Sequence, residues 1–152
     1  MKFGAGAGKL SDLLLPPRLH FMHLLDHASI AVSDLATARP FYDAVMAALG
    51  ADKVYDREDA LGYGARCDTN ADDHTCLAVY ASPGASSDPK RHWCFKAANR
   101  AQVEAFHTAG LAHGGHDDGA PGLRPHYHAH YFAAFLLDPS GNRIEAVCHR
   151  AE

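Results

Sequence analysis

Residues 137–147 read LDPSGNRIEAV, and this stretch determines how the end of the chain folds. Its centre, Asp138-Pro139-Ser140-Gly141-Asn142, consists of residues that favour a tight turn. Proline fixes φ, glycine accepts a left-handed backbone, and aspartate and asparagine side chains bond to the nearby main chain. The flanking segments are rich in apolar and β-branched residues, which is typical of strands. We therefore expect two strands, over 131–137 and 143–149, joined by this turn.

The chain contains the same order of elements twice. A shift of the sequence against itself by 65 residues aligns similar residues without a gap, as an internal repeat requires. The aligned pairs are His27 with His92, Ile30 with Phe95, Asp34 with Asn99, Ala36 with Ala101, and Phe41 with Phe106. We infer two modules, at about 23–82 and 90–149.

Each module is expected to form one strand, one helix and three further strands. The expected segments are strands 23–32, 52–57, 60–66 and 75–81 with a helix over 35–49, then strands 92–97, 115–118, 131–137 and 143–149 with a helix over 100–113. Asp34 is a suitable N-cap for the first helix, and Gly50 is suited to end it. The prediction is an α+β fold in which two βαβββ modules form a cupped mixed β-sheet with the helices on its outer face. The modules are expected to pack together, in one chain or across a homodimer.

The composition indicates one ordinary folded domain. Of the 152 residues, 47% are hydrophobic and 21% charged, which is typical of globular proteins. We expect a flexible N-terminal extension over 1–21, where glycine and proline recur without a sustained period, and a single domain over 22–152. The four cysteines are too sparse for a disulfide framework.

The charge and hydropathy exclude some partners. Fourteen lysines and arginines against eighteen acidic residues give a net charge of −4, so a nucleic-acid partner is not expected. No apolar run approaches the roughly 20 residues of a membrane span, and we expect a cytoplasmic protein. The twelve histidines stand out, because histidine is both a common metal ligand and a proton carrier near neutral pH.

Three motifs carry a resemblance to a known family. They are DHASIAVSDL at 26–35, Phe41-Tyr42, and the segment at 137–147 quoted above. Together they resemble the vicinal oxygen chelate superfamily, which includes glyoxalase I, extradiol dioxygenases, fosfomycin resistance proteins and bleomycin-binding proteins. The resemblance covers about residues 23–149. It implies the fold more firmly than the reaction, because one fold supports many activities.

The resemblance implies a metal site made by His27, His92 and Glu145. Two imidazoles and one carboxylate with open positions suit Fe(II), and they also accept Mn(II), Ni(II) or Zn(II). The alternative is that these are ordinary polar residues on strands. The matched positions of the two histidines in the repeat favour the metal.

Strand alternation adds candidates for substrate binding, because successive side chains point to opposite faces. Ser29 is expected to share the face of His27, and Cys94 and Lys96 the face of His92. All three are predicted to line the substrate site.

The segment at 75–81 departs from the glyoxalase I pattern. That enzyme carries a fourth ligand, a carboxylate, in the last strand of its first module. Here the inward positions are expected to be Ala78 and Tyr80, and neither is acidic. This favours relatives with three ligands, and Tyr80 is a candidate catalytic hydroxyl at the rim of the site or an ordinary strand tyrosine.

The segment at 125–131 reads PHYHAHY, with histidines at alternating positions. By its place in the family it suggests pocket residues: Arg124 for substrate binding, and Tyr127 and His128 as candidate acid or base groups. The alternative is a solvated loop whose histidines have no role.

The sequence thus leaves several functions open. The first is a metalloenzyme that chelates adjacent oxygens of a small substrate, with lyase, isomerase or ring-cleaving dioxygenase chemistry. The alternative is a protein that only sequesters a small molecule, as bleomycin-binding proteins do. A thiol transferase like the fosfomycin resistance enzymes is less favoured, because Lys96 alone does not make a phosphonate site. The three candidate ligands favour the metalloenzyme.

Overall fold

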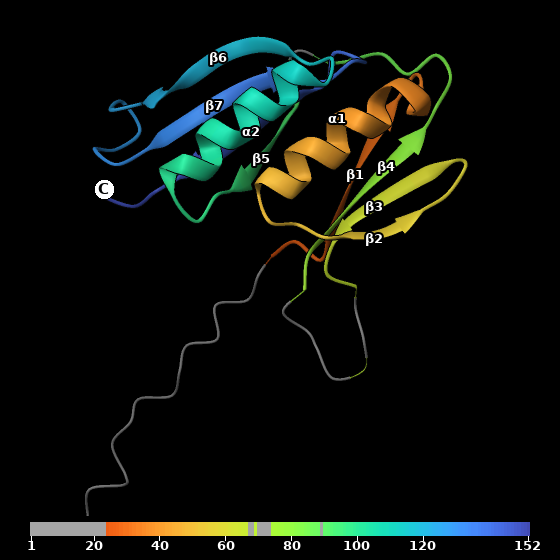
Figure 1. Ribbon diagram of the computed structural model, residues 1–152, viewed down its shortest axis with the longest axis horizontal. Coiled ribbons are helices and arrows are strands. Elements are labelled where there is room, and N and C mark those ends of the chain that lie inside the picture. The colour runs from red at the N-terminus through yellow and green to blue at the C-terminus, as the bar shows by residue number, and fades with distance from the viewer. Residues whose placement is uncertain (1–23, 67–68, 70–73, 89) are drawn as a thin grey trace, which may run out of the picture.

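A computed structural model describes residues 24–66, 69, 74–88 and 90–152 (Figure 1). The extension expected over 1–21 lies outside these residues. No helix in the described part of the chain is long and apolar enough to cross a membrane.

The first module contains one helix and a four-stranded sheet. Its elements are β1 (His27–Val32), α1 (Leu35–Ala48), β2 (Lys53–Asp56), β3 (Ala60–Gly64) and β4 (Cys76–Ala81). The strand order is β1-β4-β3-β2. β1 and β4 are parallel, and the other neighbouring pairs are antiparallel.

The second module repeats this arrangement. Its elements are β5 (His92–Lys96), α2 (Arg100–Ala112), β6 (His116–Leu123), β7 (Phe132–Leu137) and β8 (Arg143–Cys148). The strand order is β5-β8-β7-β6, again with one parallel pair, β5 and β8. The predicted α+β fold of two βαβββ modules is therefore confirmed, with its β layer divided into two mixed sheets.

The predicted boundaries agree with the structure within a few residues, except at β6. A strand was expected over 115–118, but β6 continues to Leu123 through register shifts around Gly119. Gly119 has a positive φ of 152°, which allows the chain to bulge and then resume pairing. β6 is an edge strand, and an edge strand tolerates the glycine and proline of this segment.

The two helices begin where the sequence indicated. Asp34 caps α1, with its carboxylate accepting a hydrogen bond from the backbone N–H of Ala36 at 2.9 Å. Asn99 caps α2 in the same way through the N–H of Gln102, also at 2.9 Å. These side chains satisfy backbone donors that a helix start leaves without partners.

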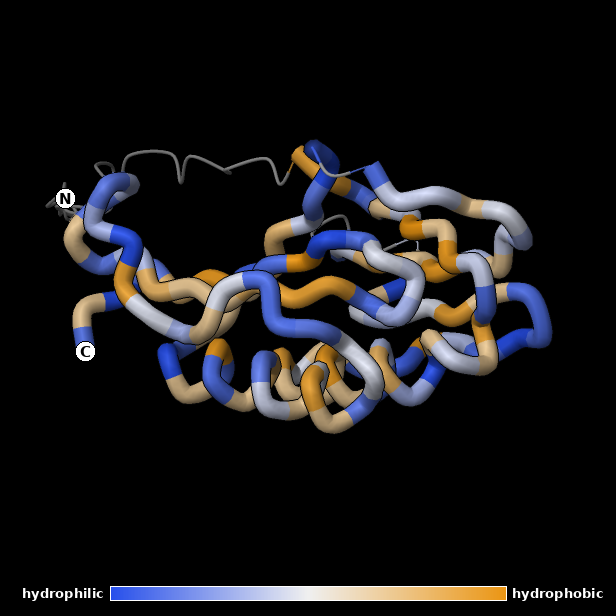
Figure 2. The backbone as a smooth tube through the Cα atoms, turned by 90° about the horizontal axis from the view of Figure 1, so that it is seen from above, coloured by the Kyte–Doolittle hydropathy of each residue, from blue (hydrophilic) through white to orange (hydrophobic). Residues whose placement is uncertain are grey.

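Both helices cover one face of the β layer, as the view from above shows (Figure 2). A single apolar core fills the space between the layers and draws on both modules. Its fully buried members include Val32, Phe41, Val45, Leu61 and Val79 from the first module, and Val103, Phe106, Leu136 and Ile144 from the second. Neither module buries its apolar face alone, and this explains why they pack as one unit.

Gly110 allows the modules to approach closely. A Cβ added to this residue of α2 would lie 2.3 Å from Leu136 Cδ1 and 3.1 Å from Phe41 Cε2. Such distances are shorter than van der Waals contact, so a larger residue would force α2 away from both α1 and β7. The absence of a side chain is therefore a packing requirement.

The turn at 138–142 also joins the modules. Asp138 is 1% exposed and accepts a hydrogen bond from the Tyr42 hydroxyl of α1 at 2.7 Å. Asn142 donates from its side chain both to Asp138, at 2.9 Å, and to the carbonyl of Ala31 in β1, at 2.9 Å. The signature at 138–142 thus links the second module to the helix and first strand of the first.

Candidate metal and substrate site

β5 and β8 bring two of the predicted ligands together. In the parallel register of these two strands, Cys94 lies beside Glu145. Cys94 is two residues after His92 on β5. Ile144 and Ala146 are buried in the core, so Glu145 points to the opposite face of the sheet. The Nε2 atom of His92 lies 3.3 Å from Glu145 Oε2.

Tyr131 holds the Glu145 carboxylate in place. Glu145 is only 3% exposed, and the Tyr131 hydroxyl donates a hydrogen bond to its Oε1 atom at 2.7 Å. Burial, and then this hydrogen bond, raise the pKa of Tyr131 well above its ordinary range. Burial and the neighbouring Glu145 likewise raise the pKa of the Cys94 thiol to about 12. Both groups therefore remain protonated donors beside the carboxylate near neutral pH.

Tyr131 was not among the predicted site residues. It directly precedes β7 and is the last residue of the 125–131 segment, in which histidines alternate with other residues. Its position at the end of that alternating segment was the available signal. Its contact with Glu145 could not be predicted, because it depends on how β7 pairs with β8.

His27 lies in a different polar group. Its Nδ1 atom is 2.6 Å from Asp26 Oδ1, and the other oxygen of Asp26 lies 3.0 Å from His74 Nε2. The hydrogen bond from His27 lowers the pKa of Asp26. A carboxylate on one ring nitrogen leaves the other, Nε2, oriented for a ligand, which is the usual arrangement of metal-binding histidines.

The predicted triad does not close within one chain. His27 begins β1 in one sheet, and His92 begins β5 in the other. β1 and β5 run in opposite directions, so their first residues lie at opposite edges of the molecule (Figure 1). Among the described residues, no three His, Cys, Asp or Glu side chains group as a metal-ligand set.

The donors of the second module fit half of a metal site. Ligand bonds of about 2.1 Å at a right angle separate two donor atoms by about 3.0 Å. The separation between His92 Nε2 and Glu145 Oε2, 3.3 Å, is close to this value. An imidazole and a buried carboxylate with its own hydrogen-bond donor also form a suitable donor pair for Fe(II), Mn(II), Ni(II) or Zn(II).

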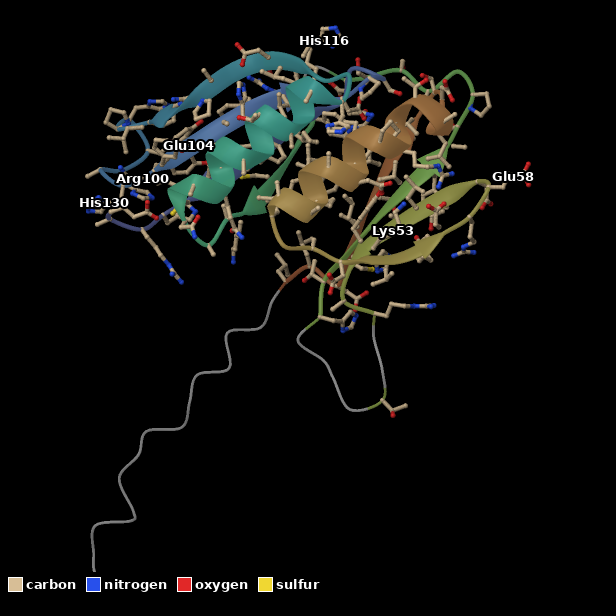
Figure 3. All side chains as sticks on the ribbon, in the orientation of Figure 1. Lys53, Glu58, Arg100, Glu104, His116 and His130 are labelled. Carbon is tan, nitrogen blue, oxygen red and sulfur yellow. The ribbon has the colours of Figure 1, made fainter. Side chains whose placement is uncertain are left out.

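His128, in the 125–131 segment, forms an imidazole pair with His149 near this half-site. His128 Nε2 lies 2.9 Å from His149 Nδ1, and the backbone N–H of His130 donates to His128 Nδ1 at 3.2 Å. The Tyr131 ring packs edge-on against both imidazoles, with centroids 5.5 Å and 5.1 Å away. Tyr131 therefore contacts this pair while its hydroxyl bonds to Glu145. His130 lies at the outer end of the second module (Figure 3).

The other two residues predicted from this region lie on the same part of the molecule. Tyr127 is 62% exposed, and its ring centroid lies 4.7 Å from that of Tyr131. Arg124 donates to the carbonyl of Ala120 at 2.8 Å and lies over the ring of Phe135. Phe135 pairs with Glu145 in the register of β7 and β8, so it shares the face of that carboxylate.

Ser29 and Tyr80 lie with His27 on the first sheet. Ser29 is exposed on β1, two residues after His27. Tyr80, on β4, is 44% exposed and contacts Tyr55, whose pKa is raised by burial and by this neighbour. The predicted site residues thus divide into two groups. The group of the first sheet consists of His27, Ser29 and Tyr80. The group of the second module consists of His92, Cys94, Lys96, Arg124, Tyr127, His128 and Glu145.

The family model described as the Glyoxalase/Bleomycin resistance protein/Dioxygenase superfamily matches residues 24–146. The chain belongs to this superfamily. The match includes both modules and confirms the family that the sequence motifs resemble.

Solved structures with this fold come from several bacteria. A glyoxalase/bleomycin resistance protein from Albidiferax ferrireducens T118 is 29% identical, with a TM-score of 0.68, over 84% of this chain and 98% of its own. A family enzyme from Burkholderia phytofirmans PsJN is 20% identical, with a TM-score of 0.60 and coverages of 82% and 98%. Lactoylglutathione lyase from Agrobacterium tumefaciens is 18% identical, with a TM-score of 0.55 and coverages of 82% and 92%. No curated protein matches the chain.

Proposed function

We propose that the protein is a metal-dependent lyase or isomerase that acts on a small substrate with adjacent oxygens. His92 and Glu145 of one chain and His27 of a second copy would hold the divalent ion. The observation that carries the proposal is the pair of donor atoms 3.3 Å apart, with the carboxylate buried and bonded to Tyr131. In an ordinary surface ion pair the carboxylate stays in contact with water, because burying a charged group costs free energy. A buried carboxylate with an additional hydrogen-bond donor is therefore typical of a functional site.

The second copy is proposed because each chain carries separated parts of the ligand set. The His27 side chain is 65% exposed, and the His92 side chain is 46% exposed, so both are accessible to a partner. A two-fold axis that brings His27 of one copy to His92 and Glu145 of the other also makes the reciprocal contact. The dimer would then contain two equivalent sites.

A divalent ion bound there supplies polarisation of the substrate oxygens and stabilises the negative charge that develops on them. The chain supplies the remaining functions. Tyr131 orients Glu145, and the His128 and His149 imidazoles, 2.9 Å apart, can take up and return a proton beside the site. This imidazole pair favours a proton-transfer reaction over ring cleavage by dioxygen.

The test is metal content, followed by turnover. Elemental analysis of untagged protein is expected to find about one ion per chain, as two equivalent sites per dimer require. The ion should be lost in His27→Ala and Glu145→Gln and retained in the control His116→Ala, an exposed histidine at the start of β6. Loaded protein is then assayed with thiol adducts of α-ketoaldehydes and with catechols.

Metal content in Glu145→Gln equal to that of the wild type would refute the ligand assignment. Cleavage of catechols alone would replace the proposed reaction with dioxygenase chemistry. Binding of substrates without turnover would support the sequestering function that bleomycin-binding relatives suggest.

A further inference from the structure

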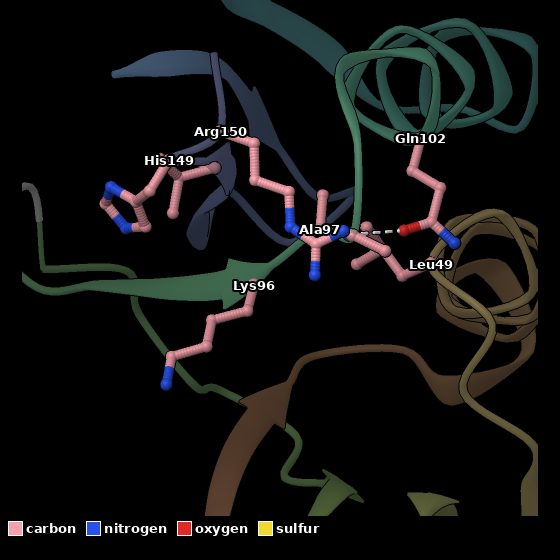
Figure 4. Close-up of a pocket in the computed structure, with 8 residues that line it drawn as sticks. Leu49, Lys96, Ala97, Gln102, His149 and Arg150 are labelled. Carbon is pink, nitrogen blue, oxygen red and sulfur yellow. Dashed lines mark hydrogen bonds between the residues drawn. The ribbon is translucent and has the colours of Figure 1, made fainter. Parts of the chain in front are cut away.

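A cavity of about 430 Å³ lies where β5 and β8 end, beside the end of α1 and the start of α2. Its walls include Lys96, Gln102, Val147, His149, Arg150 and Leu49 (Figure 4). Its volume is within the range of roughly 300–1,000 Å³ that is typical of small-molecule sites. Of these residues, only Lys96 was predicted from the sequence to bind substrate.

The charge around this cavity is positive. Lys96 and Arg150 both line it, and none of the described residues in its walls is acidic. Neither cation has a carboxylate oxygen within 4.0 Å in the part of the chain that the structure describes. Two cations without acidic partners are notable in a chain with a net charge of −4. They favour an anionic ligand.

Side chains, not the helix end, would recognise the anion. The backbone N–H of Ala98 donates to Gln102 Oε1 at 2.7 Å, and that of Arg100 donates to Glu152 Oε1 at 2.9 Å. These amides at the start of α2 are therefore already satisfied. In Figure 4 the Arg150 guanidinium lies between Lys96 and Gln102, so these three side chains offer donors to a ligand, and the His149 ring also lines the cavity.

The rest of the cavity suits an apolar group. Leu49, Val147 and two alanines contribute aliphatic surface to its walls. A guanidinium binds a carboxylate through two parallel hydrogen bonds, and a lysine adds a second positive charge. Apolar walls next to such a pair fit a compact organic anion better than a bare inorganic ion.

We propose that this cavity binds small organic anions that carry a carboxylate on a compact apolar body. Arg150 and Lys96 bind the carboxylate, Gln102 donates from its amide, and Leu49 and Val147 contact the apolar part. The proposal does not depend on the metal site. However, Val147 is two residues after Glu145 on the same face of β8, about 7 Å along the strand. An anionic substrate of the proposed enzyme could therefore reach both.

The test is calorimetric titration of the full chain, without added metal, with benzoate, benzamide and inorganic phosphate. Benzoate is expected to bind saturably, with benzamide and phosphate at least tenfold weaker. Lys96→Met should weaken benzoate binding by about tenfold, the effect of losing one charge-assisted hydrogen bond, and Arg150→Gln should weaken it by at least as much. The control Lys90→Met, which removes an exposed lysine outside the cavity, should leave it unchanged.

No saturable binding of benzoate would overturn the proposal. Equal affinity for benzamide, or unchanged affinity in Arg150→Gln, would do the same. Phosphate binding as tight as benzoate would overturn the choice of a carboxylate and indicate a phosphorylated ligand. Because metal content is measured separately, absence of the ion with intact benzoate binding would refute the metal site alone, and the reverse result would refute this proposal alone.

Discussion

Replacing Tyr42 with phenylalanine tests whether the turn at 138–142 holds the two modules together. The substitution removes one atom, the hydroxyl that donates to Asp138 at 2.7 Å, and leaves the rest of the side chain in place. The ring is fully buried and packs edge-on against Phe41, with centroids 5.2 Å apart, so the apolar contacts are retained. The measured effect is therefore that of the hydrogen bond.

The expected loss follows from the burial of the acceptor. A hydrogen bond to a charged group contributes about 1.5–3 kcal/mol, and removing its donor leaves a buried acceptor less satisfied. Asp138 keeps three other bonds, from the backbone N–H groups of Ser140 and Asn142 and from the Asn142 side chain. We therefore expect the lower part of that range, about 1.5–2 kcal/mol, or a decrease in Tm of roughly 3–8 °C for a chain of this length.

Urea unfolding followed by circular dichroism gives the free energy of unfolding directly. Burial, and then the neighbouring Asp138, raise the pKa of Tyr42 well above its ordinary value, so the loss should be the same across neutral pH. The control Tyr127→Phe removes a hydroxyl from a side chain that is 62% exposed, and it should change stability by less than about 0.5 kcal/mol. A Tyr42→Phe protein as stable as the wild type would refute the stabilising role of the hydrogen bond between Tyr42 and Asp138.

Three further predictions follow from the packing and the charges. Tyr131→Phe should lower metal affinity by about 10–100-fold, because it removes the hydrogen bond that orients the metal-binding carboxylate. Equal affinity of the variant and the wild type in competition with a chelator would contradict this. The hydrogen bond from His107 at 2.7 Å lowers the pKa of Asp117 in the folded protein. The bond therefore stabilises the fold fully above the pKa that Asp117 has in the unfolded chain, and this stabilisation is lost as the pH falls through its lower pKa in the folded protein. The stability advantage of wild type over Asp117→Asn should therefore decrease below about pH 4 in urea titrations, and a constant difference would contradict it. Gly110→Ala should destabilise the protein by about 1–3 kcal/mol despite alanine's higher helix propensity, whereas the control Thr108→Ala on the exposed face of α2 should not.

The sequence alone predicted the fold and the faces of the strands. The repeat and the turn signature indicated two modules, and the period of two in each strand indicated which residues point away from the helices. Ile144 is buried in the core, and Glu145 meets His92 on the other face, as this alternation requires. These predictions hold because they depend on local backbone geometry.

The relation between the modules could not be predicted in this way. The shift of 65 residues shows that His27 and His92 occupy matched positions in their modules. It contains no information on how the modules are oriented. Because β1 and β5 run in opposite directions, matched positions lie at opposite edges of the molecule (Figure 1).

Contacts between distant segments were missed for the same reason. The cavity joins Leu49 at the end of α1 with Gln102 of α2 and Arg150 near the end of the chain. No spacing in the sequence relates these three residues. They meet only because the helices pack against one another over a shared core.

The metal content of a mixed dimer tests most directly whether the metal site forms between two copies of the chain. One copy carries His27→Ala and the other Glu145→Gln, the two are co-expressed with different tags that lack histidine, and the mixed species is isolated by two affinity steps. If sites form between copies, one site of the dimer has all its ligands and the other has lost two. We therefore expect about half of the wild-type metal content in the mixed dimer and almost none in either single-variant protein. Almost no metal in the mixed dimer, beside a full content in the wild type, would show that the ligands come from one chain and would contradict the proposed site.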